Sequence, residues 1–512
     1  MLNAPPTVAA MHRGSVIRLF TDGLAWGISA GDHDAALAVV DGRDILFAAH
    51  AERYSRVKND PHLNEDLIAD ALQFGSPSQV VLHERPLLKA TRKWLSGQAF
   101  ESPTRARKAT SDLARMLRKL GVEAPIRLVG HHRSHAAAAY LLSDLPSAAI
   151  VVVDAIGEWT TTSVWHGEGD QIRLVWTQNY PHSVGLFYSA FTRRCGFRPN
   201  EEEFFLMALA AYGEPSLTDE IKADFVATDV APRFELKMNV HRGVDWWRPD
   251  IDRTEDIAAS VQRITEDYLV DLCRWARKKT SETRLALCGG VALNCKANSR
   301  IAEASGFDEV VVPANPGDAG SSLGAIAAFG SRRLAFRSPF LGHTIGGAPD
   351  VDAVVAALVE GEIVGLAHGR AEFGPRALGG RSLLCDPRKP DAQARVNAVK
   401  RRDRFRPFAP AVLQEHFHDL FDGPAPYTPY MQFVAHVRNP RAYPGVTHVD
   451  GTARVQTVAA DQGVFRRVLE GFHQRTGCPA LLNTSLNVKG EPLVNTREDC
   501  RRFEETHGVR VF

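Results

Sequence analysis

The chain has few cysteines and no closely spaced pair of them. Its 512 residues include seven cysteines, and the absence of any CxxC spacing excludes a zinc ribbon or a dithiol redox motif. No stretch reaches the roughly 18 consecutive apolar residues of a membrane-spanning helix. The first residues also lack the basic and apolar regions of a signal peptide. We therefore expect a protein of a reducing, cytoplasmic compartment that does not associate with a membrane.

An excess of charge of either sign is also missing. The chain carries 61 Lys and Arg against 60 Asp and Glu, for a net charge of +1. This balance provides no electrostatic basis for binding nucleic acid or an anionic lipid surface. With 44% hydrophobic and 24% charged residues, the composition is that of a globular protein. The length predicts about two to four structural units.

Three short apolar strands are predicted at the start of the chain, near residues 26–29, 35–40 and 44–49. A polar turn that contains His33 joins the first two. Lobes of the ribonuclease-H-like type, as in actin and sugar kinases, begin in this way, with the first hairpin facing phosphates. His33 is therefore either a general base or a hairpin cap. Lys58 follows the third strand, where most lysines are simply solvated.

Two histidines four residues apart, His131 and His135, open an alanine-rich helix. Residues i and i+4 share a helix face, so both imidazoles can point to one place. The next apolar strand ends at Asp154, at the edge of an open sheet where ligands usually bind. A mixed nitrogen and oxygen metal site is one interpretation. The alternative is that both histidines decorate a surface helix.

Two glycine-rich loops follow strands later in the chain. Gly289 and Gly290 lead into a helix through Asn294, an order that can present backbone N–H groups to a phosphate or can simply form a tight turn. Asp318 lies in a second loop of small residues. It is free to bind a metal, or it can cap the helix that follows.

A Gly/Pro-rich link near residues 338–349 predicts a boundary before a second unit. This unit holds Arg376, Lys400 and Arg406 among glycines, prolines and aromatic residues. Cations on such a stiff backbone suit fixed recognition of phosphate oxygens, although exposed arginines are ordinarily only solvated. Asn483 lies in a polar loop beside an apolar strand and is a candidate nucleotide or substrate contact.

Taken together, these motifs resemble those of the O-carbamoyltransferases of nodulation-factor and antibiotic biosynthesis, the nodulation-protein and tobramycin type. The resemblance covers nearly the whole chain, from about residue 27 to residue 494. Six motifs in the family's order carry it: His-His-Arg-Ser-His, Gly-Gly-Val-Ala-Leu-Asn, Pro-Gly-Asp-Ala-Gly, Glu-Phe-Gly-Pro-Arg-Ala-Leu-Gly, Phe-Arg-Pro-Phe-Ala-Pro and Leu-Asn-Thr-Ser-Leu-Asn.

The resemblance implies an α/β protein of two domains. Residues 15–335 would form an actin-like, two-lobed carbamoyl-transfer domain that binds metal and nucleotide. Residues 345–512 would form an α/β domain similar to threonylcarbamoyl-AMP synthase, which makes carbamoyl adenylate from carbamoyl phosphate and ATP. The first domain would then pass the carbamoyl group to a hydroxyl of a small natural product, a sugar or a nodulation-type oligosaccharide. A homodimer is a further expectation.

Site residues also follow from the resemblance, motif by motif. It implies a divalent metal, iron(II), manganese or magnesium, held by His131, His135, Asp154 and Asp318. His33 would lie near the acceptor hydroxyl, and Lys58 would contact the carbamoyl or phosphate group. First-domain nucleotide contacts would be Gly289, Gly290 and Asn294, and the activating residues would be Arg376, Lys400, Arg406 and Asn483.

The chain departs from the family pattern at Phe205, where the family often has lysine, and at Ala208, which replaces a glycine. The helix is therefore more apolar, which points to a different acceptor pocket. Two alternative functions are a threonylcarbamoyl-type tRNA-modifying enzyme, disfavoured by the balanced charge, and a non-catalytic regulator that binds nucleotide and metal on an actin-like fold.

Overall fold

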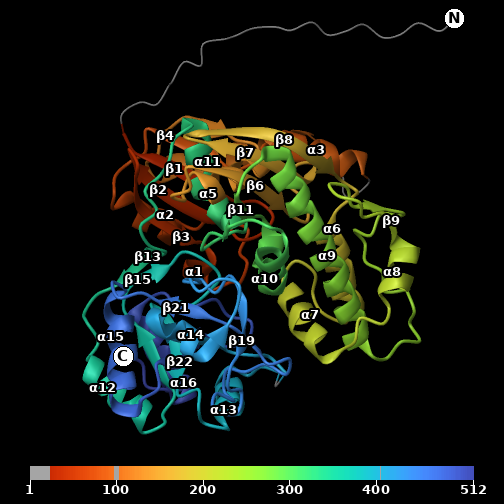
Figure 1. The fold of residues 1–512 in the computed structure, drawn as a ribbon. Helices are drawn as coiled ribbons and strands as arrows, with labels where there is room; N and C mark the ends of the chain where they lie inside the picture. The colour runs from red at the N-terminus through yellow and green to blue at the C-terminus, as the bar shows by residue number, and fades with distance from the viewer. Residues whose placement is uncertain (1–22, 97–102, 404) are drawn as a thin grey trace, which may run out of the picture.

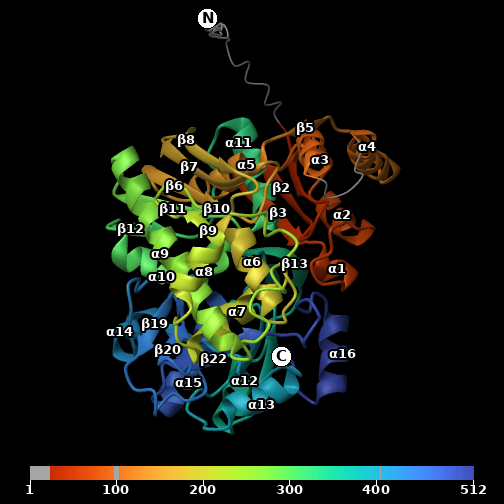
Figure 2. The same ribbon diagram turned by 90° about the vertical axis from the view of Figure 1, so that its right-hand side faces the viewer.

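A computed structural model describes residues 23–96, 103–403 and 405–512 of the chain. The protein is a mixed α/β structure with two parts (Figure 1). The elements within residues 25–330, coloured red to green, form the upper part, and those within residues 340–512, coloured cyan to blue, form the lower part. The view turned by 90° shows the same division (Figure 2). Residues 15–22 of the predicted first domain lie outside the described residues. Within the described residues, no helix is long and apolar enough to cross a membrane.

The first sheet has five strands in the order β3-β2-β1-β4-β5. Strand β1 pairs antiparallel with β2 and parallel with β4, so a three-stranded meander is extended by two parallel strands. The three strands predicted at the start of the chain are confirmed. The bounds are β1 (Ala25–Ser29), β2 (Ala36–Asp41), β3 (Asp44–His50), β4 (Gln79–Leu82) and β5 (Ile126–Leu128).

The second sheet repeats this topology. Its order is β12-β11-β6-β7-β8, with β6 antiparallel to β7 and parallel to β11. Read from β8, each strand matches its counterpart in the first sheet in order and direction. The upper part is therefore built from two similar halves. The bounds are β6 (Ser147–Val153), β7 (Thr160–Glu168), β8 (Gln171–Asn179), β11 (Arg284–Cys288) and β12 (Glu309–Val311).

Helices α5 (His131–Tyr140) and α11 (Ser321–Gly330) pack against each other and against both sheets, α11 on β1 and α5 on β6 and β11. A Cβ at Gly324 would lie 2.0 Å from the carbonyl oxygen of Ser134, so the two helices approach this closely only because glycine has no side chain. The residues that begin α5 and α11 are consequently brought to one place between the sheets.

Further helices flank the two sheets, and the long helix α9 crosses the yellow-green region beside α6, α7 and α8 (Figure 1). Helix α9 buries one face, with Ile257, Val261 and Ile264 among its buried residues. The bounds are α1 (Glu52–Ser55), α2 (Glu65–Leu72), α3 (Pro86–Leu95), α4 (Pro103–Lys119), α6 (Val184–Arg194), α7 (Glu203–Leu209), α8 (Thr218–Phe225), α9 (Thr254–Thr280), α10 (Cys295–Ala304), the 3-10 turns η1 (Ala210–Tyr212), η2 (Gly290–Leu293) and η3 (Asp318–Gly320), and strands β9 (Val226–Thr228) and β10 (Glu235–Leu236).

The lower part contains a five-stranded sheet in the order β14-β16-β22-β17-β21, with two smaller sheets beside it. The predicted link at 338–349 is not a plain linker, because it contains β13, which pairs antiparallel with β15. The bounds are β13 (Phe340–Ile345), β14 (Val364–Ala367), β15 (Gly369–Glu372), β16 (Arg381–Cys385), β17 (Ala409–Leu413), β18 (Phe421–Asp422), β19 (Val434–Val437), β20 (Thr452–Arg454), β21 (Gln456–Val458), β22 (Ala480–Ser485), α12 (Val351–Val359), α13 (Ala392–Val399), η4 (Gln414–His416), α14 (Phe417–Leu420), α15 (Gly463–Thr476) and α16 (Arg497–His507).

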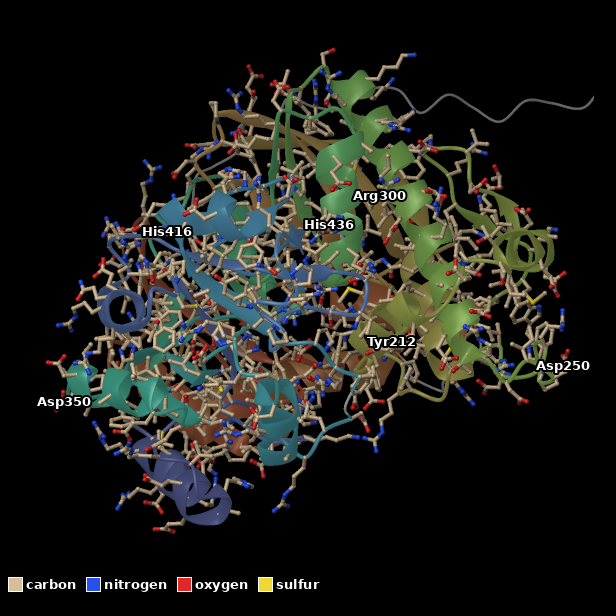
Figure 3. The ribbon with its side chains drawn as sticks, turned by 60° about the horizontal axis from the view of Figure 1, so that its bottom comes forward. Tyr212, Asp250, Arg300, Asp350, His416 and His436 are labelled. Carbon is tan, nitrogen blue, oxygen red and sulfur yellow. The ribbon has the colours of Figure 1, made fainter. Side chains whose placement is uncertain are left out.

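Specific polar contacts join the two parts. Helix α10 of the upper part lies beside β19 of the lower part, as Arg300 and His436 mark in Figure 3. Lys296 of α10 forms an ion pair with Asp450 at 2.6 Å. Because both side chains are mostly buried, this pair is less screened by solvent than a surface ion pair.

Candidate functional site

Two histidines and two aspartates meet between the two sheets of the upper part. His131 and His135, one turn apart on α5, direct their Nε2 atoms toward each other at 3.1 Å. The Nε2 atom of His131 lies 2.9 Å from Oδ2 of Asp154, which follows β6. The Nε2 atom of His135 lies 3.1 Å from Oδ1 of Asp318, which opens η3. Residues from three distant segments thus converge as the sequence predicts.

All four side chains are buried or nearly so, and their charges depend on one another. Burial alone would lower the pKa of the histidines, but the charge of Asp318 and the hydrogen bond with Asp154 raise the pKa of His131 to about 9. Burial would likewise raise the pKa of Asp154, yet its bonds with both histidines hold that pKa well below the usual range. The two histidines and two aspartates therefore stabilise one another's charges.

The donor set fits a divalent metal. One ligand atom from each of the four residues lies within 4.8 Å of the others, and imidazole nitrogens with carboxylate oxygens are common metal ligands. The surface-helix alternative is wrong, because both histidines are buried. The capping alternative for Asp318 is also wrong, because Gly317 occupies the N-cap position of η3 and Gly320 that of α11.

His33 lies at the open side of this cluster. Its Nε2 is 3.8 Å from Oδ2 of Asp318, and its Nδ1 is 3.0 Å from Oδ2 of Asp34. Burial would lower the pKa of His33, but the bond with Asp34 and the charge of Asp318 raise it to about 10. His33 therefore faces the predicted metal ligands rather than acting only within the hairpin.

The Gly289–Gly290 loop packs behind the cluster of two histidines and two aspartates. Gly289 has φ of +94°, and a Cβ there would lie 2.2 Å from the carbonyl oxygen of Val153, so no other residue fits. The backbone N–H of Gly290 donates to Oδ1 of Asp154 at 3.3 Å. The amide of Asn294 caps α10 and bonds to Gln262. These contacts give the loop a structural role, and its predicted contact with nucleotide stays a prediction.

One cleft of about 950 Å³ connects the cluster of two histidines and two aspartates to the lower part of the molecule. His33, Asp154 and Asp318 line one end, with Gly290 nearby, whereas Lys58 lines the cleft beside Phe204. The predicted activating residues Arg376, Lys400, Arg406 and Asn483 line the same cleft from the lower part. His131 and His135 lie directly behind the two aspartates.

The lower end of the cleft is crowded with cations. Burial and the charge of Arg454 lower the pKa of Arg376 to about 9. Burial, followed by the charges of Arg406 and Arg454, holds the pKa of Arg402 well below its usual range. Like charges repel one another in such a setting. A bound polyanion would relieve this repulsion between the arginines.

Lys400 is held in place at this end by oxygen atoms. Its Nζ donates to the backbone oxygen and Oγ of Ser485 and to both the backbone oxygen, at 2.9 Å, and Oδ1, at 2.8 Å, of Asn487. Asn483 donates from Nδ2 to Gln456 at 2.7 Å, while its Oδ1 is buried with no hydrogen-bond partner among the described residues. Both side chains are thus fixed beside the cleft.

Two phenylalanines of α7 contact cations from both parts. Arg406 stacks over the rings of Phe204 and Phe205, at 4.9 and 4.5 Å from the ring centroids. Lys58 lies 5.7 Å from the centroid of Phe204, on the cleft wall. Figure 3 shows Tyr212, just beyond α7, at the boundary between the two parts. The departure at Phe205 therefore lies against Arg406, one of the residues predicted to take part in activation.

Two arginines of the cation cluster, Arg402 and Arg454, are additional to the predicted set. Both line the cleft, and each has a buried Nε with no hydrogen-bond partner among the described residues. Arg402 lies four residues before Arg406, and Arg454 ends β20 in a segment rich in polar residues, so the local sequence did mark both segments as polar. Only the fold places them beside Arg376.

Comparison with known proteins agrees with this organisation. The models named carbamoyltransferase N-terminus and carbamoyltransferase C-terminus match residues 79–327 and 355–512. The uncharacterized protein sll1178 of Synechocystis sp. is 34% identical over 93% of each chain. Nodulation protein NolO of Bradyrhizobium diazoefficiens is 33% identical over 73% of this chain and 75% of its own. The 3'-hydroxymethylcephem-O-carbamoyltransferase of Amycolatopsis lactamdurans is 29% identical over 93% of this chain and 95% of its own.

These matches cover both parts of the molecule and most of the residues that line the cleft. The prediction of an enzyme is confirmed, and the alternative of a non-catalytic regulator is wrong. The resemblance drawn from the six sequence motifs is confirmed as well: the chain belongs to the carbamoyltransferase family.

Proposed function

We propose that the protein is an ATP-dependent O-carbamoyltransferase that carries out two reactions in one cleft. The observation that supports this most directly is the shared lining. A carboxylate and histidine cluster suited to carbamoyl transfer and a cation cluster suited to phosphates face the same space of about 950 Å³. An activated intermediate made at one end would therefore be close to the other end.

The repeated strand order of the upper part supports an actin-like, two-lobed domain for residues 15–335. The sheet β14-β16-β22-β17-β21 supports a separate α/β domain for residues 345–512, which we propose to be similar to threonylcarbamoyl-AMP synthase. Strand β13 connects the two domains and pairs with the second.

The first reaction forms carbamoyl adenylate at the lower end of the cleft. Carbamoyl phosphate, ATP and water give carbamoyl adenylate, pyrophosphate and phosphate. This step brings several anions together, and fixed cations lower its barrier by stabilising the charge that develops on phosphate oxygens. Arg376, Lys400 and Arg406 are placed to do this, with Arg402 and Arg454 beside them.

The second reaction transfers the carbamoyl group to an alcohol at the upper end. The acceptor oxygen attacks the carbamoyl carbon, AMP leaves, and the hydroxyl proton passes to a base. His33 is the imidazole on the cleft wall beside Asp318. Lys58, which lines the cleft beside Phe204, would hold the carbamoyl or phosphate oxygens.

His131, His135, Asp154 and Asp318 would hold a divalent metal, and iron(II), manganese and magnesium all accept such ligands. When bound, this ion would supply a Lewis acid and offset the carboxylate charge that raises the pKa of His33. An imidazole whose pKa lies near neutral pH is largely unprotonated there and is therefore free to accept the hydroxyl proton.

The acceptor is proposed from the relatives. Their names point to a nodulation factor and to a hydroxymethyl cephem, so we expect a hydroxyl on a small natural product or oligosaccharide. The aromatic residues Phe204 and Phe205 make one wall of the cleft apolar.

The test is the formation of AMP and pyrophosphate from ATP, followed with radiolabelled carbamoyl phosphate. We expect AMP only when carbamoyl phosphate is present. Lys400→Met should abolish it, whereas Lys119→Met, on the exposed face of α4, should leave it unchanged. His33→Ala should retain adenylate formation and lose transfer to an alcohol. If ATP and carbamoyl phosphate together yield neither AMP nor carbamoyl adenylate, the proposal fails.

A further inference from the structure

His131 has a second ring nitrogen whose environment differs from that of the first. Its Nε2 faces Asp154, His135 and Asp318, whereas its Nδ1 is buried and has no hydrogen-bond partner among the described residues. A carboxylate oxygen, Oε2 of Glu84, lies 3.8 Å from Nδ1. This separation is slightly too long for a hydrogen bond, and a small tilt of the ring would close it.

The chemistry of imidazole makes this second nitrogen important. A neutral imidazole that offers Nε2 to a metal carries its proton on Nδ1, and metal-binding histidines commonly donate that proton to a carboxylate. A buried N–H without an acceptor is unfavourable, because its hydrogen bond to water is lost and not replaced. His131 is only 3% exposed, so solvent does not supply the acceptor.

Glu84 is held in a suitable position by a chain of charges. It follows β4, so it reaches the cluster from the end of a parallel strand. Lys89 donates to both of its carboxylate oxygens, at 2.7 and 2.9 Å, and also contacts Asp32 at 2.8 Å. The lysine keeps a nearly buried carboxylate charged and fixes its orientation.

A competing interpretation is a second metal bound by His83, Glu84 and His131, whose ligand atoms also lie close together. The position of Lys89 argues against it. An ammonium group 2.7 Å from the carboxylate already neutralises Glu84 and would repel a divalent cation. Glu84 is therefore better suited to accept a hydrogen bond than to bind a metal ion.

We propose that Glu84 is a positioning residue that accepts a hydrogen bond from the Nδ1–H of His131 and so fixes the ring with Nε2 toward the metal ligands. The inference rests on the metal site of the proposed function. Removal of such a supporting carboxylate typically weakens metal binding by about 10–100-fold. Because Glu84 does not itself bind the ion, the number of ions bound should stay the same.

The test measures metal binding rather than activity. The full-length protein is freed of metal with a chelator and titrated with Mn²⁺, and free Mn²⁺ is followed by electron paramagnetic resonance. We expect one ion per wild-type chain and a dissociation constant raised about 10–100-fold in Glu84→Gln. Glu282→Gln is the matched control, because Glu282 contacts His166 at 2.7 Å in a carboxylate–histidine pair elsewhere in the fold. Its Mn²⁺ affinity should equal that of the wild type.

Three results would overturn the inference. Equal affinity of Glu84→Gln and wild type would show that the carboxylate does not support His131. Two ions in the wild type and one in the variant would make Glu84 a ligand of a second site. A wild type that binds no Mn²⁺ would refute the metal site itself. If Glu84→Gln does not fold, Lys89→Met tests the same series of contacts from Lys89 through Glu84 to His131. We expect a smaller loss of Mn²⁺ affinity for this variant, and no loss of affinity would refute the inference.

Discussion

Replacing Phe205 with leucine should weaken ATP binding through Arg406. The Phe205 ring lies 4.5 Å from the guanidinium carbon of Arg406 and is 4% exposed. A desolvated cation–π contact contributes about 1–2 kcal/mol. If that energy serves to hold Arg406 against the phosphates, its loss corresponds to a KM for ATP raised about 5–30-fold.

The assay is carbamoyl phosphate-dependent AMP formation at varied ATP concentration, so that KM and kcat are separated. Phe205 also packs on Phe197 at a centroid distance of 5.3 Å, and the substitution should cost roughly 1–3 kcal/mol of stability. Phe187→Leu is the control for this packing loss, because Phe187 is fully buried away from the cation cluster. It should lower the stability without raising KM.

A double-mutant cycle decides whether the effect passes through Arg406. In an Arg406→Met background the Phe205→Leu substitution should cost little further affinity for ATP. An equal rise in KM with and without the arginine would refute the reasoning, since the ring would then act by some route other than the cation.

Further predictions concern the metal cluster, the contact between domains and the glycine loop. Asp318→Asn should sharply lower the content of tightly bound divalent metal, measured by elemental analysis after dialysis; unchanged content would contradict the ligand assignment. Burial opposes the charge of Asp450, but its hydrogen bond with His448, followed by the charge and hydrogen bond of Lys296, holds its pKa far below the ordinary value. This stabilisation is complete above about pH 5 and is lost as the pH falls below about 4, so Lys296→Met should flatten the dependence of urea unfolding on pH in that range, and an unchanged dependence would refute the linkage. Gly289→Ala combines a positive φ with a clash 2.2 Å from Val153 and should cost at least about 2 kcal/mol; wild-type stability in urea unfolding would contradict this.

The sequence by itself determined those parts of the site that depend on local geometry. The i, i+4 spacing on one helix placed His131 and His135 on a common face, and the end of a buried strand placed Asp154 at the ligand edge of a sheet. The three initial strands were predictable because each is a short apolar run closed by a polar turn. The segments that carry Arg376 and Lys400 were also recognisable from the sequence, because nearby glycines and prolines mark a stiff backbone with fixed cations.

Only the tertiary structure decided which distant segments share a space. It showed that Gly289 is required by the carbonyl of Val153, and that Asn294 caps a helix with its amide. It also brought Glu84 to the second nitrogen of His131. Hydrophobic periodicity records which face of an element is buried, but not which other element covers it. The convergence of charges from separate strands and helices is therefore a property of the packing, which the local sequence does not encode.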